Sequence, residues 1–244
     1  MKKESWKKLL VVGIFAAAMG FLEAVVVVYL RKLYYPQGFN FPLSNIETTI
    51  LNIEWVRELF TIVMLVCIGL LAGKKLYEKF AYFLYSFAVW DIFYYIWLKV
   101  ILNWPSSLLT WDLLFLIPWP WVGPVLAPII YSITIIILAL CIVHCQDKNY
   151  KVKLNLKEWT LFILGSLLIL YTFIYDYGQF LFKEGFVYQL LTFTTNEALG
   201  QQVFSYIPTS YNWTLFIIGE MLIIISIFLF CQEPDTPPTL VGGS

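Results

Sequence analysis

Six apolar stretches, each long enough to cross a lipid bilayer, constrain the fold of this chain more than any other feature. A helix needs roughly 20 residues to span a hydrocarbon core about 30 Å thick. We expect such helices at residues 9–30, 50–72, 80–102, 122–145, 159–175 and 213–231. The sequence therefore predicts an all-α, polytopic integral membrane bundle of six transmembrane helices. It forms one domain over residues 1–231, and residues 232–244 form a flexible tail.

The composition excludes several other classes of protein. Of the 244 residues, 60% are hydrophobic and only 13% are charged, whereas about a quarter of an average soluble domain is charged. Neither a disordered chain nor a soluble α/β enzyme has this balance. Lys and Arg number 16, as do Asp and Glu, so the positive excess of a nucleic-acid-binding protein is absent. We expect membrane lipids, and no nucleic acid, among its partners.

The distribution of Lys and Arg predicts the orientation, because cytoplasmic loops retain these residues. One side of the predicted bundle holds eleven of them: Lys2, Lys3, Lys7, Lys8, Lys74, Lys75, Lys79, Lys148, Lys151, Lys153 and Lys157. The other half holds five: Arg31, Lys32, Arg57, Lys99 and Lys183. We therefore predict that both termini are cytoplasmic (N-in/C-in), in a multi-pass protein of the plasma (cytoplasmic, or cell inner) membrane.

Two regions between the predicted helices are apolar but too short to span. Residues 103–121 are rich in Trp and Pro, and their apolar core of about 14 residues is typical of a re-entrant or interfacial segment. Prolines interrupt the entry to the fourth helix, which must then pack in protein or face a water-filled cavity. Residues 178–211 form a long outer connection, either an amphipathic helix or a lid. The outer interface should also collect five tryptophans: Trp104, Trp111, Trp119, Trp121 and Trp213.

Ionisable residues inside the predicted helices are the candidates for a functional site. A charged side chain at the bilayer centre costs about 2.5–3.5 kcal/mol on insertion scales, so each needs a partner, a cavity or a proton. Most of them fall in the outer half of the bundle, which predicts an outward-facing polar cavity. The candidates for a substrate or proton site are Glu23, Glu54, Arg57, Glu58, Asp91, Lys99, Asp112 and Glu220.

The second predicted helix carries the densest group of these residues. Glu54, Arg57, Glu58 and Thr61 are spaced at i, i+3, i+4 and i+7, which places them on one face of a helix. A purely structural role is the alternative: Arg57 as a buried partner of Glu54 or Glu58, a protonated Glu23, and Asp91 either as a cap or paired with Lys99.

The sequence offers no established catalytic or cofactor motif. Phosphate-binding glycine loops, nucleophile elbows and Cys-x-x-Cys pairs are missing. Cys141, His144 and Cys145 have ligand chemistry without zinc-like spacing, and His144 is the only histidine. We therefore expect no metal and no cofactor. All four cysteines fall near the cytoplasmic helix ends, where thiols stay reduced.

Internal similarity in the last two helices adds a weak indication of transport. The heptapeptide at residues 159–165 closely matches that at 213–219. If the match reflects a duplication, the copies run in opposite directions, as in inverted-repeat transporters. The small residues at 16–20 favour close helix packing.

Three functional hypotheses follow. The first is a carrier for a small solute or ion, or the substrate-binding membrane subunit of one, with protonatable carboxylates. Because carboxylates outnumber cations at the site, a cationic or neutral polar ligand is favoured. The second is a membrane enzyme acting on a lipid head group, with Glu58 or Asp91 as general base while Arg57 and Lys99 hold a phosphate. The third is a structural subunit of a larger complex or oligomer, which would contain no cavity.

Overall fold

Six long helices make up most of the part of the chain that the structure describes, as the apolar stretches predict. The computed structural model describes residues 1–117, 120–148, 155–183 and 205–232. Each helix has the length and apolar character needed to cross a membrane, so the prediction of six helices able to span a bilayer is confirmed. The predicted tail and most of the outer connection at 178–211 lie outside the described residues. The helices are α1 (Lys3–Tyr34), α2 (Thr48–Ala72), α3 (Leu76–Leu102), α4 (Leu126–Asp147), α5 (Leu156–Lys183) and α8 (Trp213–Gln232).

A short β-hairpin departs from the all-α prediction. Strands β1 (Trp111–Phe115) and β2 (Trp121–Pro124) pair antiparallel, with Asp112 opposite Gly123. The fourth helix therefore begins at Leu126, four residues later than expected, because residues 121–124 belong to β2. Prolines in this region disfavour the helical conformation of the residues before them. Close packing also selects Gly123, since a Cβ atom there would lie 3.1 Å from a ring carbon of Phe173.

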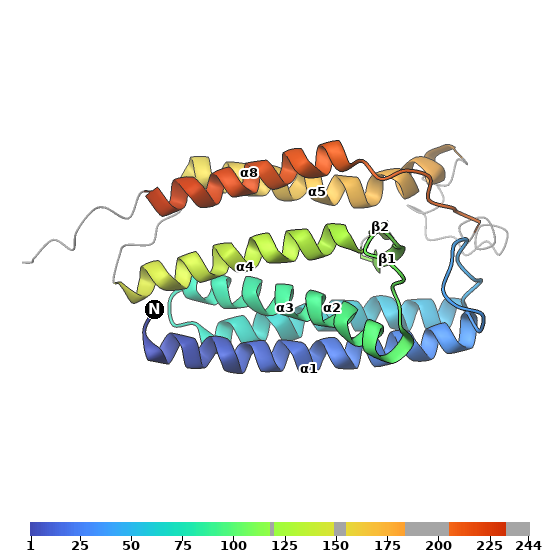
Figure 1. Cartoon of the computed structure of the whole chain (residues 1–244), viewed down its shortest axis with the longest axis horizontal. Coiled ribbons are helices and arrows are strands. Elements are labelled where there is room, and N and C mark those ends of the chain that lie inside the picture. Colours follow the sequence, from blue (N-terminus) through green and yellow to red (C-terminus); the bar gives the residue numbers. More distant parts are fainter. Residues whose placement is uncertain (118–119, 149–154, 184–204, 233–244) are drawn as a thin grey trace, which may run out of the picture.

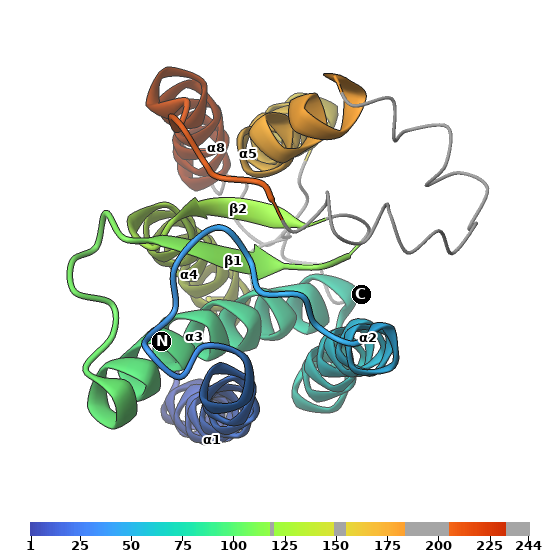
Figure 2. The same ribbon diagram turned by 90° about the vertical axis from the view of Figure 1, so that its right-hand side faces the viewer.

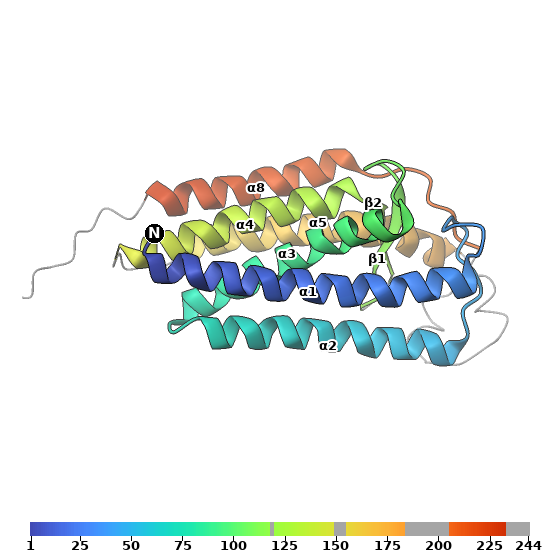
Figure 3. The same cartoon turned by 60° about the horizontal axis from the view of Figure 1, so that its bottom comes forward.

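The helices form two groups, with the hairpin between them at one end. Helix α3 packs against α1, α2 and α4, while α5 pairs with α8. Figure 2 shows the hairpin lying across the bundle end, between the α1–α3 group and the α5–α8 pair. Gly20 allows α1 to approach α3, because a Cβ atom there would lie 2.9 Å from the carbonyl oxygen of Trp90. The close packing expected at residues 16–20 is therefore present; Figure 3 shows α1 and α2 in front of the bundle.

The two matching heptapeptides meet at their last residues. Helices α5 and α8 run in opposite directions side by side (Figure 1). The last residue of each heptapeptide is a glycine, and a Cβ atom on Gly165 would lie 2.6 Å from the carbonyl oxygen of Gly219. A Cβ atom on Gly219 would lie 2.9 Å from the carbonyl oxygen of Gly165. The repeated glycines thus serve one antiparallel contact.

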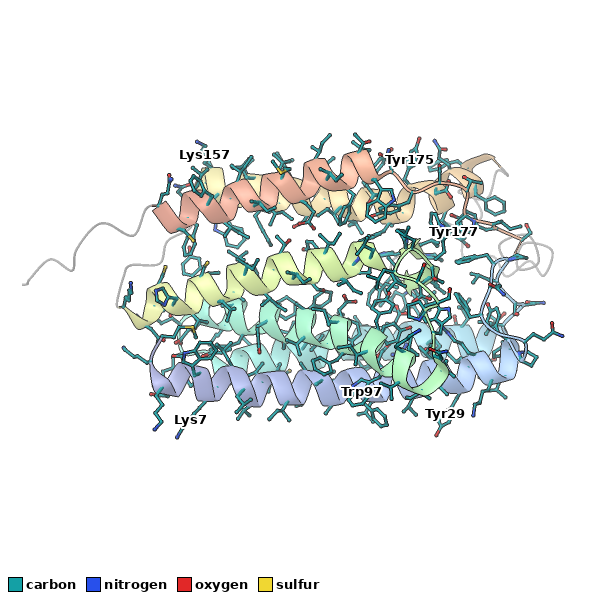
Figure 4. All side chains as sticks on the ribbon, viewed as in Figure 1. Lys7, Tyr29, Trp97, Lys157, Tyr175 and Tyr177 are labelled. Atoms are coloured by element: carbon teal, nitrogen blue, oxygen red, sulfur yellow. The ribbon has the colours of Figure 1, made fainter. Side chains whose placement is uncertain are left out.

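The bundle has two chemically different ends. Figure 4 shows Lys7 and Lys157 at one end, which we call the lysine end, and Tyr29, Tyr175 and Tyr177 toward the other. The hairpin lies at this second end, which we call the hairpin end (Figure 1). At the lysine end the N-terminal segment is fixed to α4, because the Lys2 backbone N–H and the Ser5 hydroxyl both donate hydrogen bonds to Asp147.

A buried carboxylate at the start of α5 caps that helix. Glu158 accepts hydrogen bonds from the backbone and side-chain nitrogens of Asn155, and its own backbone N–H donates to the Asn155 side-chain oxygen. This reciprocal arrangement is a capping box. Glu158 is buried near the lysine end, and its position in the first turn of α5 assigns it to helix capping.

Candidate functional site

A polar cavity lies among α1, α2, α3 and the hairpin, and it contains most of the predicted site residues. Its volume is about 110 Å³, enough for a few water molecules or a small cation. Between α1 and α2 it extends to Tyr35, Phe39 and Ile46 at the hairpin end. Its charged lining residues are Glu23, Arg31, Glu54, Arg57, Glu58, Asp91 and Asp112. We call this space the polar cavity.

Three acidic residues reach the cavity from a similar depth. At 1.5 Å per residue, Glu23 lies about 16 Å before the end of α1, Glu58 about 15 Å after the start of α2, and Asp91 about 16 Å before the end of α3. These helix ends all lie at the hairpin end (Figure 1). The cavity therefore brings carboxyl groups from three helices together near the middle of their spans.

Arg57 lies between two of the carboxylates. Its Nε is 2.8 Å from Glu54 Oε2, and its Nη1 forms an ion pair with Glu23. The hydroxyl of Thr61 lies 3.4 Å from Glu23 Oε2 and 3.1 Å from the Arg57 carbonyl oxygen. The pairing with Glu54 follows from the helical spacing. The pairing with Glu23 could not be read from that spacing, because Glu23 belongs to another helix.

Glu58 has a different partner from the one considered in the sequence analysis. Its Oε2 accepts a hydrogen bond of 2.8 Å from the backbone N–H of Leu116, just after β1. Within the described ranges, no Lys or Arg nitrogen forms an ion pair with Glu58. The interpretation that Arg57 is the counter-ion of Glu58 is therefore wrong, because Glu23 and Glu54 occupy the guanidinium.

Asp112 belongs to a second ion pair, which the sequence analysis missed. Arg31 Nη2 lies 3.0 Å from Asp112 Oδ1, and both side chains are buried. The guanidinium carbon of Arg31 also lies 3.7 Å from the ring centre of Trp104 and 4.4 Å from that of Phe39. Burial raises the pKa of Asp112 to about 6, while Arg31 acts in the opposite direction. An aspartate within an apolar segment needs a counter-ion. Arg31, in the last turn of α1, was the residue in the sequence that could have indicated this pair.

The remaining candidates lie apart from this cluster or on its edge. Asp91 accepts a 2.8 Å hydrogen bond from the Ser132 hydroxyl rather than pairing with Lys99. The Lys99 ammonium instead donates to the carbonyl oxygens of Asn103 and Pro105. Glu220 of α8 accepts a 2.8 Å hydrogen bond from Thr134 of α4. Lys99 and Glu220 are not lining residues of the polar cavity.

Three of the predicted interfacial tryptophans make specific side-chain contacts near the hairpin. Trp104 covers Arg31, and the Trp121 ring stacks on Phe173 with ring centres 6.2 Å apart. Trp111 contacts the ring of Tyr211. Trp119 lies outside the described residues. The described tryptophans near the hairpin thus fix it to the surrounding helices.

The charge balance of the polar cavity decides what it can bind. Five carboxyl groups, those of Glu23, Glu54, Glu58, Asp91 and Asp112, accompany two guanidinium groups. Full ionisation leaves a surplus of negative charge, which a cation or proton must balance in a site of low dielectric. The cavity is therefore suited to a cation and unsuited to an anion.

The four cysteines are not lining residues of the polar cavity. Cys67, Cys141, Cys145 and Cys231 are free thiols, and the described part of the chain contains no group of three or more metal-ligating side chains suited to a metal ion.

The chain matches no protein-family model, no curated protein and no solved structure.

Proposed function

We propose that this protein carries a small cation, or a solute exchanged for a proton, through the polar cavity. The observation that supports this proposal is the environment of Glu58. Arg57 is already bound by Glu23 and Glu54, so Glu58 is a surplus acidic group held by one backbone N–H. Such a group binds either a proton or a cation. Because the two compete for one carboxylate, the movement of the cation is coupled to the movement of the proton.

The positive-inside rule gives the proposed direction. Cytoplasmic loops retain Lys and Arg, so the lysine end faces the cytoplasm of a plasma membrane and the hairpin end faces outward. The polar cavity then opens to the outside between α1 and α2. The hairpin acts as a re-entrant segment, because Leu116 contacts Glu58 about 15 Å along α2. Such a backbone is tolerated at this depth only where protein or a cavity surrounds it.

The two alternative functions fit the geometry less well. A lipid head-group enzyme was expected to hold phosphate with Arg57 and Lys99. Two carboxylates occupy Arg57, whereas Lys99 binds carbonyl oxygens outside the polar cavity. A structural subunit was expected to contain no cavity, and this bundle contains the polar cavity.

A flux assay tests the proposal. The full chain is reconstituted in proteoliposomes containing a pH-sensitive dye, and Na⁺, K⁺ or choline is added outside. At least one cation should drive proton efflux, Glu58→Gln should abolish it, and Glu47→Gln should leave it unchanged. Glu47 is the matched control because it is an exposed carboxylate just before α2. The absence of any response in the unmodified protein, or an unchanged response in Glu58→Gln, would contradict the proposal.

A further inference from the structure

A second cavity, on the other side of Asp91, is chemically unlike the first. It has a volume of about 350 Å³ and lies among α3, α4, α5 and the hairpin, with one residue contributed by α2. Aromatic and aliphatic side chains form most of its wall, including Phe83, Phe87, Phe115, Trp121 and Phe173. We call it the apolar cavity. It falls within the roughly 300–1,000 Å³ of typical ligand pockets.

The apolar cavity reaches the lipid-facing surface near the middle of the membrane span. Its lining includes Ile62 of α2 and Leu167 of α5, both near the midpoints of their helices. Leu167 is 54% exposed. Figure 2 shows α2 and α5 on opposite sides of the hairpin. Hydrocarbon, rather than water, therefore surrounds this opening in a bilayer.

Two residues that line this cavity carry buried hydrogen-bond donors, and one of them, Trp90, also borders the polar cavity. The indole nitrogens of Trp90 and Trp121 have no hydrogen-bond partner among the described residues, and Trp90 as a whole is only 6% exposed. Buried donors are normally satisfied, and leaving one unpaired costs about 1–3 kcal/mol. A ligand that carries a hydrogen-bond acceptor would satisfy them.

The charge of the cavity wall restricts the ligand further. Asp91 is its only carboxylate, held by the Ser132 hydroxyl at 2.8 Å, and none of the described lining residues is Lys or Arg. A carboxylate anion such as that of a free fatty acid would be repelled by an ionised Asp91 and would lack a counter-ion. An ester or another neutral acceptor avoids both penalties.

We infer that the apolar cavity binds one hydrocarbon chain bearing a neutral hydrogen-bond acceptor, such as an acyl ester, that enters from the bilayer between α2 and α5. The chain fills the aromatic pocket, and its acceptor receives hydrogen bonds from the indole N–H groups of Trp90 and Trp121. The inference uses a different cavity from the cation site and does not depend on it.

Native mass spectrometry of the full chain in detergent tests the inference, with methyl stearate and stearate as probes. Both have the same hydrocarbon chain, but only stearate is an anion. We expect a saturable one-to-one adduct with methyl stearate and at least about tenfold weaker binding of stearate. Equal binding of the two probes, or no adduct with methyl stearate, would overturn the inference.

Two pairs of variants locate the adduct. Ser166→Phe places a ring in the cavity and should abolish binding, whereas Thr160→Phe adds a ring at an exposed position of the same helix and should not. Trp90→Phe removes one donor and should weaken binding about threefold to tenfold, while Trp55→Phe, at an exposed position of α2, should not. If Ser166→Phe fails to fold, the Trp90 pair still decides. Equal binding of methyl stearate by Trp90→Phe and Trp55→Phe would refute the assignment of the ligand to the apolar cavity.

Discussion

The two arginines of this protein show how one residue type serves different purposes. Arg31 has one carboxylate partner, Asp112, and is covered by the rings of Phe39 and Trp104. Arg57 has two carboxylate partners in the polar cavity, where its side chain is 21% exposed. The first pair also borders the polar cavity, but we call it closed because its two side chains are only 8% and 1% exposed. It fixes the hairpin to α1. The second cluster is open and carries surplus carboxyl groups. A closed pair indicates structure, whereas an open cluster with excess charge of one sign indicates binding.

The largest effect should come from the closed pair. Arg31→Ala leaves Asp112 buried without its counter-ion, and breaking such a pair costs about 3–5 kcal/mol. We expect a corresponding fall in thermal stability in detergent. Changing both residues, Arg31→Met with Asp112→Leu, should recover much of the loss, because apolar replacements remove both desolvation penalties. A double variant as unstable as the single one would show that the pair does not fix the hairpin.

A smaller loss is expected in the open cluster. Arg57→Ala leaves Glu23 and Glu54 without their shared cation, but the cavity of about 110 Å³ is large enough for water, which would reduce the repulsion. We expect destabilisation of about 1–3 kcal/mol, and adding Glu23→Gln should reduce it. Thermal unfolding measured beside Arg31→Ala checks the order. If Arg57→Ala proves the more damaging of the two, the cluster is structural and the contrast fails.

The pH dependence of stability should also distinguish the closed pair. Burial raises the pKa of Asp112 from its ordinary value of 3.8 to about 6. The folded protein then holds this proton more tightly than the unfolded chain, so the contribution of Asp112 to stability falls as the pH rises from about 4 to about 6. Asp112→Asn should flatten this part of the profile of melting temperature against pH. Identical slopes in the two proteins would refute the assignment.

Glu220 should show the smallest effect. It lies outside the polar cavity, and a glutamine can still accept the hydrogen bond from Thr134. Glu220→Gln should therefore change the unfolding free energy by less than about 1 kcal/mol and leave proton-coupled flux intact. A loss of flux in this variant would extend the functional site to the α4–α8 contact, and the polar cavity would no longer account for the activity.

Sequence reasoning predicted the helices better than the contacts between them. Apolar length alone predicts six spans, and helical spacing places Glu54, Arg57 and Glu58 on one face. The hairpin was missed because a short apolar run flanked by prolines has no clear periodicity. The sequence did not predict that Glu23 pairs with Arg57 or that Arg31 pairs with Asp112. The tertiary packing of separate elements decides which charges meet, and helical spacing does not reveal it. A polar cavity was nevertheless expected from the concentration of costly residues in one half of the bundle.

Infrared difference spectroscopy tests the role of Glu58 most directly. Spectra of the full chain in lipid are recorded with and without Na⁺, K⁺ and choline, for the unmodified protein, Glu58→Gln and Glu220→Gln. At least one cation should alter the carboxyl vibrations of the unmodified protein, Glu58→Gln should lose that change, and Glu220→Gln should retain it. Carboxyl signals that respond equally in Glu58→Gln and the unmodified protein would contradict a cation site at Glu58.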